Sequence, residues 1–162
     1  MNFRSILIGG LGNQMFQYAF AKTLSMRYNC PLYIKSSSII YRPYMLKIFN
    51  ILDNEGREID WNSRIFETEV YRPGFENKFK DLSDLNYDVD GFWQNENYFL
   101  EIEDIIRNDF KLEPTMVDRN SVTIQVRRGD YCNNKNFEYC DLNWYKKAIS
   151  HFGTSNININ IR

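Results

Sequence analysis

A strand pattern, a glycine-containing loop and a helix pattern follow one another at the start of the chain. Residues 3–8 have the apolar character of a buried strand, and residues 9–14 follow as Gly-Gly-Leu-Gly-Asn-Gln. Apolar side chains then recur at helical spacing between Phe16 and Leu24, and residues 32–34 read as a second strand. This order forms a βαβ unit, and such units build parallel sheets with right-handed crossovers. The predicted fold class is therefore α/β with a parallel sheet.

The glycine loop has the composition of an anion-binding site. Glycines let backbone approach a ligand closely, and the N-terminus of a helix favours negative charge. Gly10 and Gly12 fit the first two glycines of the dinucleotide-binding fingerprint, but Met15 stands at the position of the third. A Walker loop is also excluded, because no Gly-Lys-Ser/Thr follows. A glycine turn that serves only strand–helix packing is the alternative.

A second junction between strand and loop carries two arginines. Apolar and polar residues alternate over residues 122–126, and Arg127, Arg128, Gly129 and Asp130 come directly after them. Open α/β sheets bind ligands at the carboxyl ends of their strands, so we expect this loop and the glycine loop at one sheet edge. Neighbouring guanidiniums suit a diphosphate, because each offers a planar fork of donors and a permanent charge. A solvated Arg-Asp turn on the surface is the alternative.

Asp88 and Asp90 form an Asp-x-Asp pair beside a further strand pattern. Such a pair holds a divalent metal on a nucleotide diphosphate in some enzymes, and carboxylates suit Mg²⁺ or Mn²⁺. Side chains alternate between the two faces of a strand, so two carboxylates that are two positions apart share one face in any strand. The metal site is therefore an alternative to an ordinary strand pattern.

Composition limits the classes of protein to consider. The chain has 162 residues, of which 43% are hydrophobic and 16% aromatic, as in a globular domain with a real core. Its 20 Lys and Arg residues balance 21 Asp and Glu residues, so no nucleic-acid partner is expected. The longest apolar runs, such as residues 6–8, are far too short to span a membrane. The N-terminus shows no pattern of a signal peptide.

The cysteines indicate reduced thiols in a cytosolic setting. Cys30, Cys132 and Cys140 are an odd number without a dense disulfide framework. A zinc site built from Cys132, Cys140 and His151 would lack both a Cys-x-x-Cys pair and a second histidine. No metal site is therefore predicted from these residues.

The remaining segments have weaker patterns. A short helix is predicted within residues 44–51, an extended segment over 64–71, and an irregular stretch over 75–85. A strand around Val89 precedes a helix predicted over 94–110. Asp141 is the predicted N-cap of a helix that extends to Ile149, and an Asn/Ile alternation ends the chain.

Four segments give the chain a resemblance to glycosyltransferase family 11, the alpha-1,2-fucosyltransferases. In order along the chain they are Gly9–Ala19 (GGLGNQMFQYA), Asp90–Phe99 (DGFWQNENYF), Val126–Tyr131 (VRRGDY) and Trp144–Ile149 (WYKKAI). The resemblance implies a GT-B-type enzyme with two Rossmann-like lobes. It implies transfer of L-fucose from GDP-fucose to a galactoside-terminated glycan, with inversion and without a metal or other cofactor. The location that it implies is cytoplasmic, at most peripheral at the inner face of a membrane.

The resemblance also implies roles for individual residues. Arg127 would neutralise the β-phosphate of the leaving GDP, a contact that strengthens in the transition state. Arg128 would hold the loop, and Asp130 is the nearest candidate base for the acceptor hydroxyl. Asn13 matches a position that faces the donor in the related protein fucosyltransferases. The expected donor-binding residues are Gly10, Gly12, Asn13, Gln14, Arg127 and Arg128, and the expected catalytic residues are Arg127 and Asp130.

The chain departs from the family at two places. Gln125 stands where the family usually has a histidine, so it can form hydrogen bonds but cannot carry charge. The family's second lobe would begin where the chain stops. We therefore expect residues 1–150 to form the N-terminal lobe, residues 151–162 a truncated or low-complexity tail, and this chain alone to be nearly inactive. The rival hypotheses are a non-catalytic remnant and an adhesion module recognised through residues 128–130, Arg-Gly-Asp.

Overall fold

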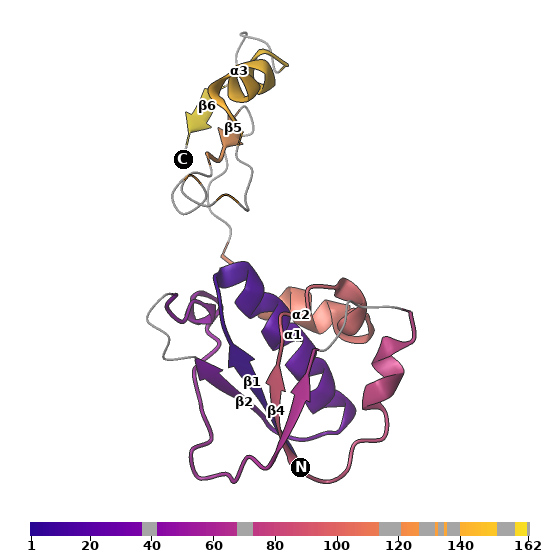
Figure 1. Cartoon of the computed structure of the whole chain (residues 1–162). Helices are drawn as coiled ribbons and strands as arrows, with labels where there is room; N and C mark the ends of the chain where they lie inside the picture. The colour runs from indigo at the N-terminus through magenta and orange to yellow at the C-terminus, as the bar shows by residue number, and fades with distance from the viewer. Residues whose placement is uncertain are drawn as a thin grey trace. The chain divides into compact units, whose positions relative to one another are not determined.

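The computed structural model describes residues 1–36, 42–67, 73–113, 121–126, 132, 135, 140–151 and 158–161. The chain divides into two compact units, Met1–Leu112 and Glu113–Arg162 (Figure 1). This boundary falls inside residues 1–150, which the sequence predicted to be one lobe, and the joint lobe stays a prediction. Among the described residues, no helix has both the length and the apolar character needed to cross a membrane.

The first unit is built on a four-stranded parallel sheet. Its strand order is β2-β1-β4-β3, and helix α1 leads from β1 to β2 (Figure 1). The bounds are β1 Asn2–Leu7, α1 Leu11–Arg27, β2 Leu32–Ser36, β3 Ser63–Phe66 and β4 Asn86–Asp90. These elements confirm the α/β class, the parallel sheet and the opening βαβ unit.

Aromatic side chains hold α1 on one face of the sheet. Phe20 and Leu24 of α1 and Phe3 of β1 are buried in one cluster with Trp93. The Phe20 and Trp93 rings stack with their centroids 4.0 Å apart. Burial of side chains of this size contributes about 1.5–3 kcal/mol each, so this contact is a main source of stability in the unit.

Helix α1 begins and ends at sequence signals. Gly10 is its N-cap, so Gly12, Asn13 and Gln14 lie in the first turn. The helix ends at Arg27, and Asn29 follows with a φ of 49°. Asparagine tolerates this left-handed conformation better than most residues do. The prediction that residues 29–31 end the helix is therefore confirmed.

The continuous helix predicted over residues 94–110 is wrong. The segment consists of two short 3₁₀ helices, η3 Glu96–Tyr98 and η4 Leu100–Ile102, followed by helix α2 Glu103–Asp109. Phe99 interrupts the first two with a φ of −134°. Tyr98 is buried and packs against the Phe20 ring. The ring centroids of Phe99 and Phe16 are 5.9 Å apart. Neighbouring side chains that both pack inward do not fit the period of a regular helix.

Two further short segments complete the first unit. The short helix predicted within residues 44–51 is the 3₁₀ helix η1 Leu46–Phe49. The stretch predicted to be irregular over 75–85 contains the 3₁₀ helix η2 Phe75–Phe79.

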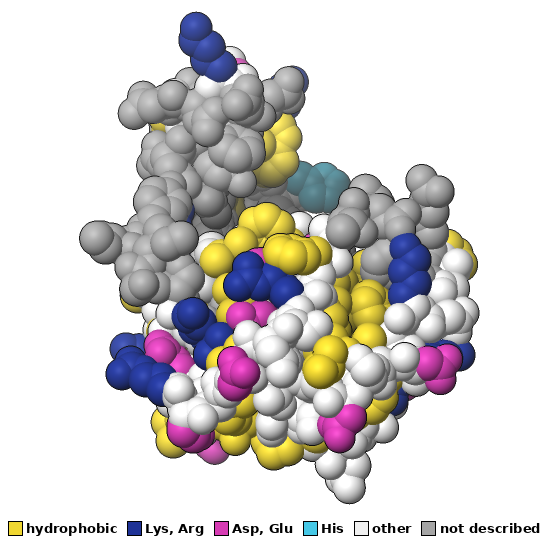
Figure 2. All heavy atoms as spheres, turned by 60° about the horizontal axis from the view of Figure 1, so that its bottom comes forward, with side chains coloured by type: hydrophobic (Ala, Val, Ile, Leu, Met, Phe, Trp, Pro, Cys, Tyr) yellow, Lys and Arg dark blue, Asp and Glu magenta, His cyan; other side chains and the backbone are white. Residues whose placement is uncertain are grey.

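Figure 2 brings forward the side of the first unit at which the strands begin. Basic, acidic and apolar side chains are interspersed on this surface.

The second unit contains a strand, a helix and a parallel strand. They are β5 Ser121–Ile124, α3 Leu142–His151 and β6 Asn158–Ile161, and β5 pairs with β6. The Asp141 carboxylate accepts a hydrogen bond from the Trp144 backbone at 2.8 Å, which confirms the predicted N-cap. Val122 was expected in the sheet of β1, but its described partner is Ile159. The tail expected to be low-complexity therefore contains a paired strand.

Candidate functional site

The backbone of the loop between β1 and α1 is open on its outer side. Gly9 has a φ of +80°, and a Cβ added there would lie 2.4 Å from Nδ2 of Asn13. A Cβ added at Gly10 or Gly12 meets no atom within 4 Å. Gly9 is therefore required by the fold, whereas Gly10 and Gly12 leave space in which a ligand can approach the backbone.

Asn13 joins this loop to the segment that follows β4. Nε2 of Gln94 donates a hydrogen bond to Oδ1 of Asn13 at 2.6 Å. Strands β1 and β4 are parallel neighbours, so the pair lies at the carboxyl ends of two adjacent strands. This is the edge at which open α/β sheets bind ligands. Gln94 was not among the predicted site residues, although it lies in a segment that resembles the family.

Gln14 supports the loop from inside. Its side chain is buried, and Nε2 donates to the carbonyl oxygens of Gly9 and Pro43, both at 2.9 Å. Its Oε1 accepts from the Met45 backbone at 2.9 Å. The amide group of Gln14 is thus used within the protein, where it holds the glycine loop. Direct contact of Gln14 with a donor stays a prediction.

Gln17 is a second buried glutamine that supports the same junction. Its Oε1 accepts a hydrogen bond from the Ile8 backbone, which follows β1, at 2.9 Å. Sequence reasoning did not assign this role. Gln17 and Tyr18 lie three and four positions after Gln14, and all three residues are buried on one face of α1. This spacing is the feature of the sequence that could have indicated a buried role for Gln17.

The Asp88 and Asp90 carboxylates face arginines. Asp88 is buried, and its Oδ1 lies 2.7 Å from Nε of Arg4. Its Oδ2 lies 3.2 Å from Nη2 of Arg4 and 3.4 Å from Nη2 of Arg64. Arg64 also reaches Asp90, with 3.7 Å between Nη1 and Oδ2. Two guanidiniums therefore occupy the positions around these carboxylates, where the metal alternative would place a cation.

The second predicted loop lies outside the described residues. Strand β5 ends at Ile124, and the described residues continue to Val126. Residues 127–131 are outside the described part of the chain. The predicted roles of Arg127, Arg128 and Asp130 in donor binding and catalysis, and the shared edge with the glycine loop, stay predictions. The Arg-Gly-Asp tripeptide of the adhesion hypothesis lies in the same segment.

Two tyrosines near α1 are held as neutral donors. Burial raises the pKa of the Tyr18 phenol far above its usual value, and its 2.8 Å hydrogen bond to Asp109 adds to the effect. Burial, with the charge of Asp53, raises the pKa of Tyr44 to about 12. The Tyr44 hydroxyl donates to the carbonyl oxygen of Ile51 at 2.7 Å. Both phenols therefore keep their protons at neutral pH and brace the fold.

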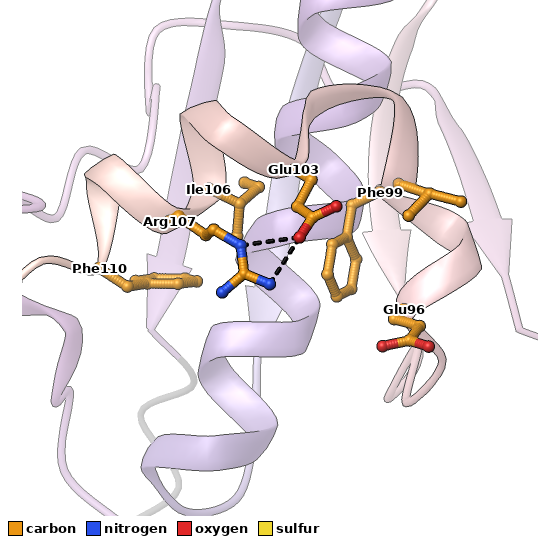
Figure 3. A pocket seen from close by; sticks show the side chains of 7 residues that line it. Glu96, Phe99, Glu103, Ile106, Arg107 and Phe110 are labelled. Carbon is orange, nitrogen blue, oxygen red and sulfur yellow. Dashed lines mark hydrogen bonds and ion pairs between the residues drawn. The ribbon is translucent and has the colours of Figure 1, made fainter.

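A surface pocket of about 640 Å³ lies along α2 and the 3₁₀ helices before it (Figure 3). Phe99, Ile106 and Phe110 form its apolar lining. Glu103 and Arg107 also line it and bond to each other, with 2.7 Å between Oε1 and Nε. An exposed pair one helical turn apart is worth only about 0.3–0.5 kcal/mol. The pocket contains none of the residues predicted to bind the donor.

Substitution of Gly9 by alanine tests the geometry of the loop. The new Cβ would displace the Asn13 side chain, and the positive φ disfavours any residue with a Cβ. We expect the free energy of unfolding to fall by about 1–3 kcal/mol, the usual cost of a strained backbone. Urea denaturation measures this loss, and Gly12→Ala, whose Cβ meets nothing within 4 Å, is the control. Equal stability of the Gly9 variant and wild type would contradict the close approach of Asn13.

Comparison with known proteins identifies the family. The family model described as Glycosyl transferase family 11 matches residues 2–161. An alpha-1,2-colitosyltransferase from Escherichia coli is 29% identical over an alignment of 162 positions, gaps included, which covers 79% of this chain and 54% of the relative. The chain thus spans about half the length of this curated relative. No solved structure matches the chain significantly.

Proposed function

The chain belongs to glycosyl transferase family 11, and we propose that it supplies the N-terminal part of an enzyme that transfers L-fucose from GDP-fucose to a galactoside hydroxyl. The observation that carries the proposal is the open backbone at Gly10 and Gly12, with Asn13 beside it at the carboxyl end of β1. That arrangement suits the diphosphate of a nucleotide sugar. The alpha-1,2 linkage in the relative's name supports the same bond in the product.

The proposed reaction is a direct displacement with inversion. The acceptor hydroxyl attacks the anomeric carbon of fucose, its proton passes to a base, and the bond to the β-phosphate breaks. Negative charge then develops on the GDP oxygen. Arg127 would neutralise it with two parallel N–H donors, and Asp130 is the proposed base. Gly10, Gly12 and Asn13 would contact the diphosphate from the glycine loop.

We further propose that no metal takes part. Arginine supplies the positive charge that a divalent ion supplies in metal-dependent transferases. The ion pairs of Asp88 and Asp90 with Arg4 and Arg64 support this proposal, because a cation at that place would have to compete with two guanidiniums.

A colitosyl donor is the second candidate, favoured by the name of the Escherichia coli relative. Colitose is fucose without its 3-hydroxyl group. A pocket built to hydrogen-bond that hydroxyl discriminates strongly against the deoxy sugar, because its polar groups are then left unpaired. The two donors can therefore be distinguished by the ratio of their kcat/KM values.

Donor competition tests the proposal. Because the chain spans 54% of the relative, the assay uses a chimera in which this chain replaces the matching part of the Escherichia coli enzyme. We expect GDP release from GDP-fucose in the presence of lactose, with the same rate in EDTA. A strong preference for GDP-colitose would select the second candidate. Loss of activity in EDTA would restore Asp88 and Asp90 as candidate metal ligands.

The 162-residue chain alone is expected to give little or no transfer. A two-lobed transferase excludes water and aligns both substrates only when both lobes enclose them. A guanidinium contact near water is weak, because the solvent dielectric screens it. Robust turnover by this chain alone would overturn the proposed need for a second lobe.

A further inference from the structure

The Glu67 carboxylate bridges the end of β3 to the turn after β4. Its Oε2 accepts hydrogen bonds from the backbone nitrogens of Phe92 and Trp93, each at 2.7 Å. The Glu67 backbone nitrogen donates to the carbonyl oxygen of Asp90 at 3.1 Å. Hydrogen bonds to a charged acceptor are roughly twice as strong as neutral ones, so Glu67 fixes this turn firmly.

The turn needs this support because its backbone is strained. Trp93 has a φ of 54°, a conformation that is a genuine outlier for a bulky residue and costs about 1–3 kcal/mol. Its side chain is fully buried and stacked on Phe20. A Cβ at Gly91 would lie 2.4 Å from Cβ of Glu67, so the two segments approach closely. The turn is thus held by the core on one side and by Glu67 on the other.

The turn places Gln94 beside the Asn13 amide. Gln94 follows Trp93 directly, and its Nε2 donates to Oδ1 of Asn13 at 2.6 Å. Because Oδ1 is the acceptor in this bond, Nδ2 is the group that remains to donate to a ligand. The position of a Cβ added at Gly9 is 2.4 Å from that Nδ2, which places the nitrogen beside the glycine loop.

We propose that Glu67 is a positioning residue for the nucleotide sugar. Through the turn 91–94 it holds Gln94 against Asn13, so that Asn13 offers a hydrogen-bond donor, and not an acceptor, to the diphosphate oxygens. The proposal rests on the proposed function for the identity of the ligand. An amide oxygen in the same place would repel the phosphate oxygens, whereas an amide nitrogen attracts them.

The first experiment tests the contacts without a ligand. In the 162-residue chain, amide hydrogen exchange is measured at Phe92 and Trp93, and NMR follows the side-chain amide of Asn13. Glu67→Ala should raise exchange at both backbone amides about tenfold or more, the factor that corresponds to 1.4 kcal/mol. It should also shift the Asn13 signal. Glu67→Gln keeps an acceptor and should restore part of the protection.

A matched control separates this effect from a general loss of stability. Glu103→Ala removes a partly exposed carboxylate whose partner is Arg107. It should leave the amides of residues 92 and 93 and the Asn13 signal unchanged. Wild-type protection in Glu67→Ala, or an Asn13 signal that does not move, would overturn the positioning role whatever the ligand is.

The second experiment tests the donor orientation with GDP as the probe. Gln94→Glu places an acceptor-only carboxylate against Asn13, so the Asn13 amide should turn and direct Oδ1 outward. GDP titration of the chimera, followed at the amides of Gly10 and Gly12, should then show at least about tenfold weaker binding. Gln94→Met, which removes the donor without adding charge, should weaken binding less.

The two experiments fail in different ways. Equal GDP affinity of Gln94→Glu and wild type would overturn the donor orientation of Asn13. If the wild-type chimera gives no response to GDP at Gly10 and Gly12, the proposed function fails, and the exchange at Phe92 and Trp93 still decides whether Glu67 holds the turn.

Discussion

Replacement of Asp88 by alanine should lower the free energy of unfolding of the first unit by about 3–5 kcal/mol, the usual cost of removing one partner of a buried ion pair. Asp88 is 5% exposed and Arg4 is 7% exposed. The guanidinium of Arg4 would remain buried after the substitution, without the carboxylate that accepts two of its hydrogen bonds.

Among the described residues, the other contacts of Arg4 are with a backbone carbonyl and an aromatic ring, not with a second carboxylate. Its Nη1 donates to the carbonyl oxygen of Glu55 at 3.0 Å, and its guanidinium carbon lies 4.2 Å from the Trp61 ring centroid. These contacts with Glu55 and Trp61 hold the Arg4 guanidinium in place. Arg64, which also faces Asp88, would lose a partner and add to the uncompensated positive charge.

Urea denaturation of the purified chain measures this loss. Asp88→Asn keeps the size of the side chain and some hydrogen bonding, so it should cost less than alanine. Exchange of both partners, Arg4→Met with Asp88→Leu, should recover much of the stability, because an apolar pair carries no desolvation penalty. A loss below about 1 kcal/mol in Asp88→Ala would mean that the pair behaves like an exposed one.

Arg127→Lys should lower kcat of the full-length chimera by about 10²–10³-fold, the effect of removing one transition-state donor. Lysine keeps the positive charge but loses the planar fork that would follow the departing phosphate. Because this contact strengthens as the bond breaks, the KM for the galactoside should change little. Steady-state kinetics with varied acceptor separate the two parameters.

Arg57→Lys is the matched control for this change. It makes the same chemical exchange at a side chain that is 84% exposed and pairs with Glu55. Turnover in this variant should equal that of the parent chimera. A fall in kcat that is equally large in both variants would remove the special role of Arg127, and an effect on the galactoside KM alone would assign it to acceptor binding.

Features encoded in neighbouring residues could be predicted from the sequence. The βαβ unit, the end of α1 near Asn29 and the N-cap at Asp141 follow from local periodicity and from residues with known backbone preferences. The glycine loop was also recognisable, because Gly10, Gly12 and Asn13 are adjacent to the end of a clear strand.

Features created by strand register could not be predicted. Asp88 meets Arg4 across 84 residues, since β1 and β4 pair with these two residues opposite each other. Glu67 meets the turn at Trp93 only because β3 pairs with β4. The break near Phe99 depends on inward packing of consecutive aromatic side chains, which local propensity does not encode.

The most direct test of the proposed transfer is analysis of the sugar product. The chimera is incubated with GDP-fucose and lactose, and the product linkage is determined by NMR. We predict a fucosylated lactose with an alpha-1,2 bond, formed together with an equal amount of GDP. The contradicting result is a folded chimera that makes no fucosylated product, while the Escherichia coli enzyme transfers its own sugar in the same assay.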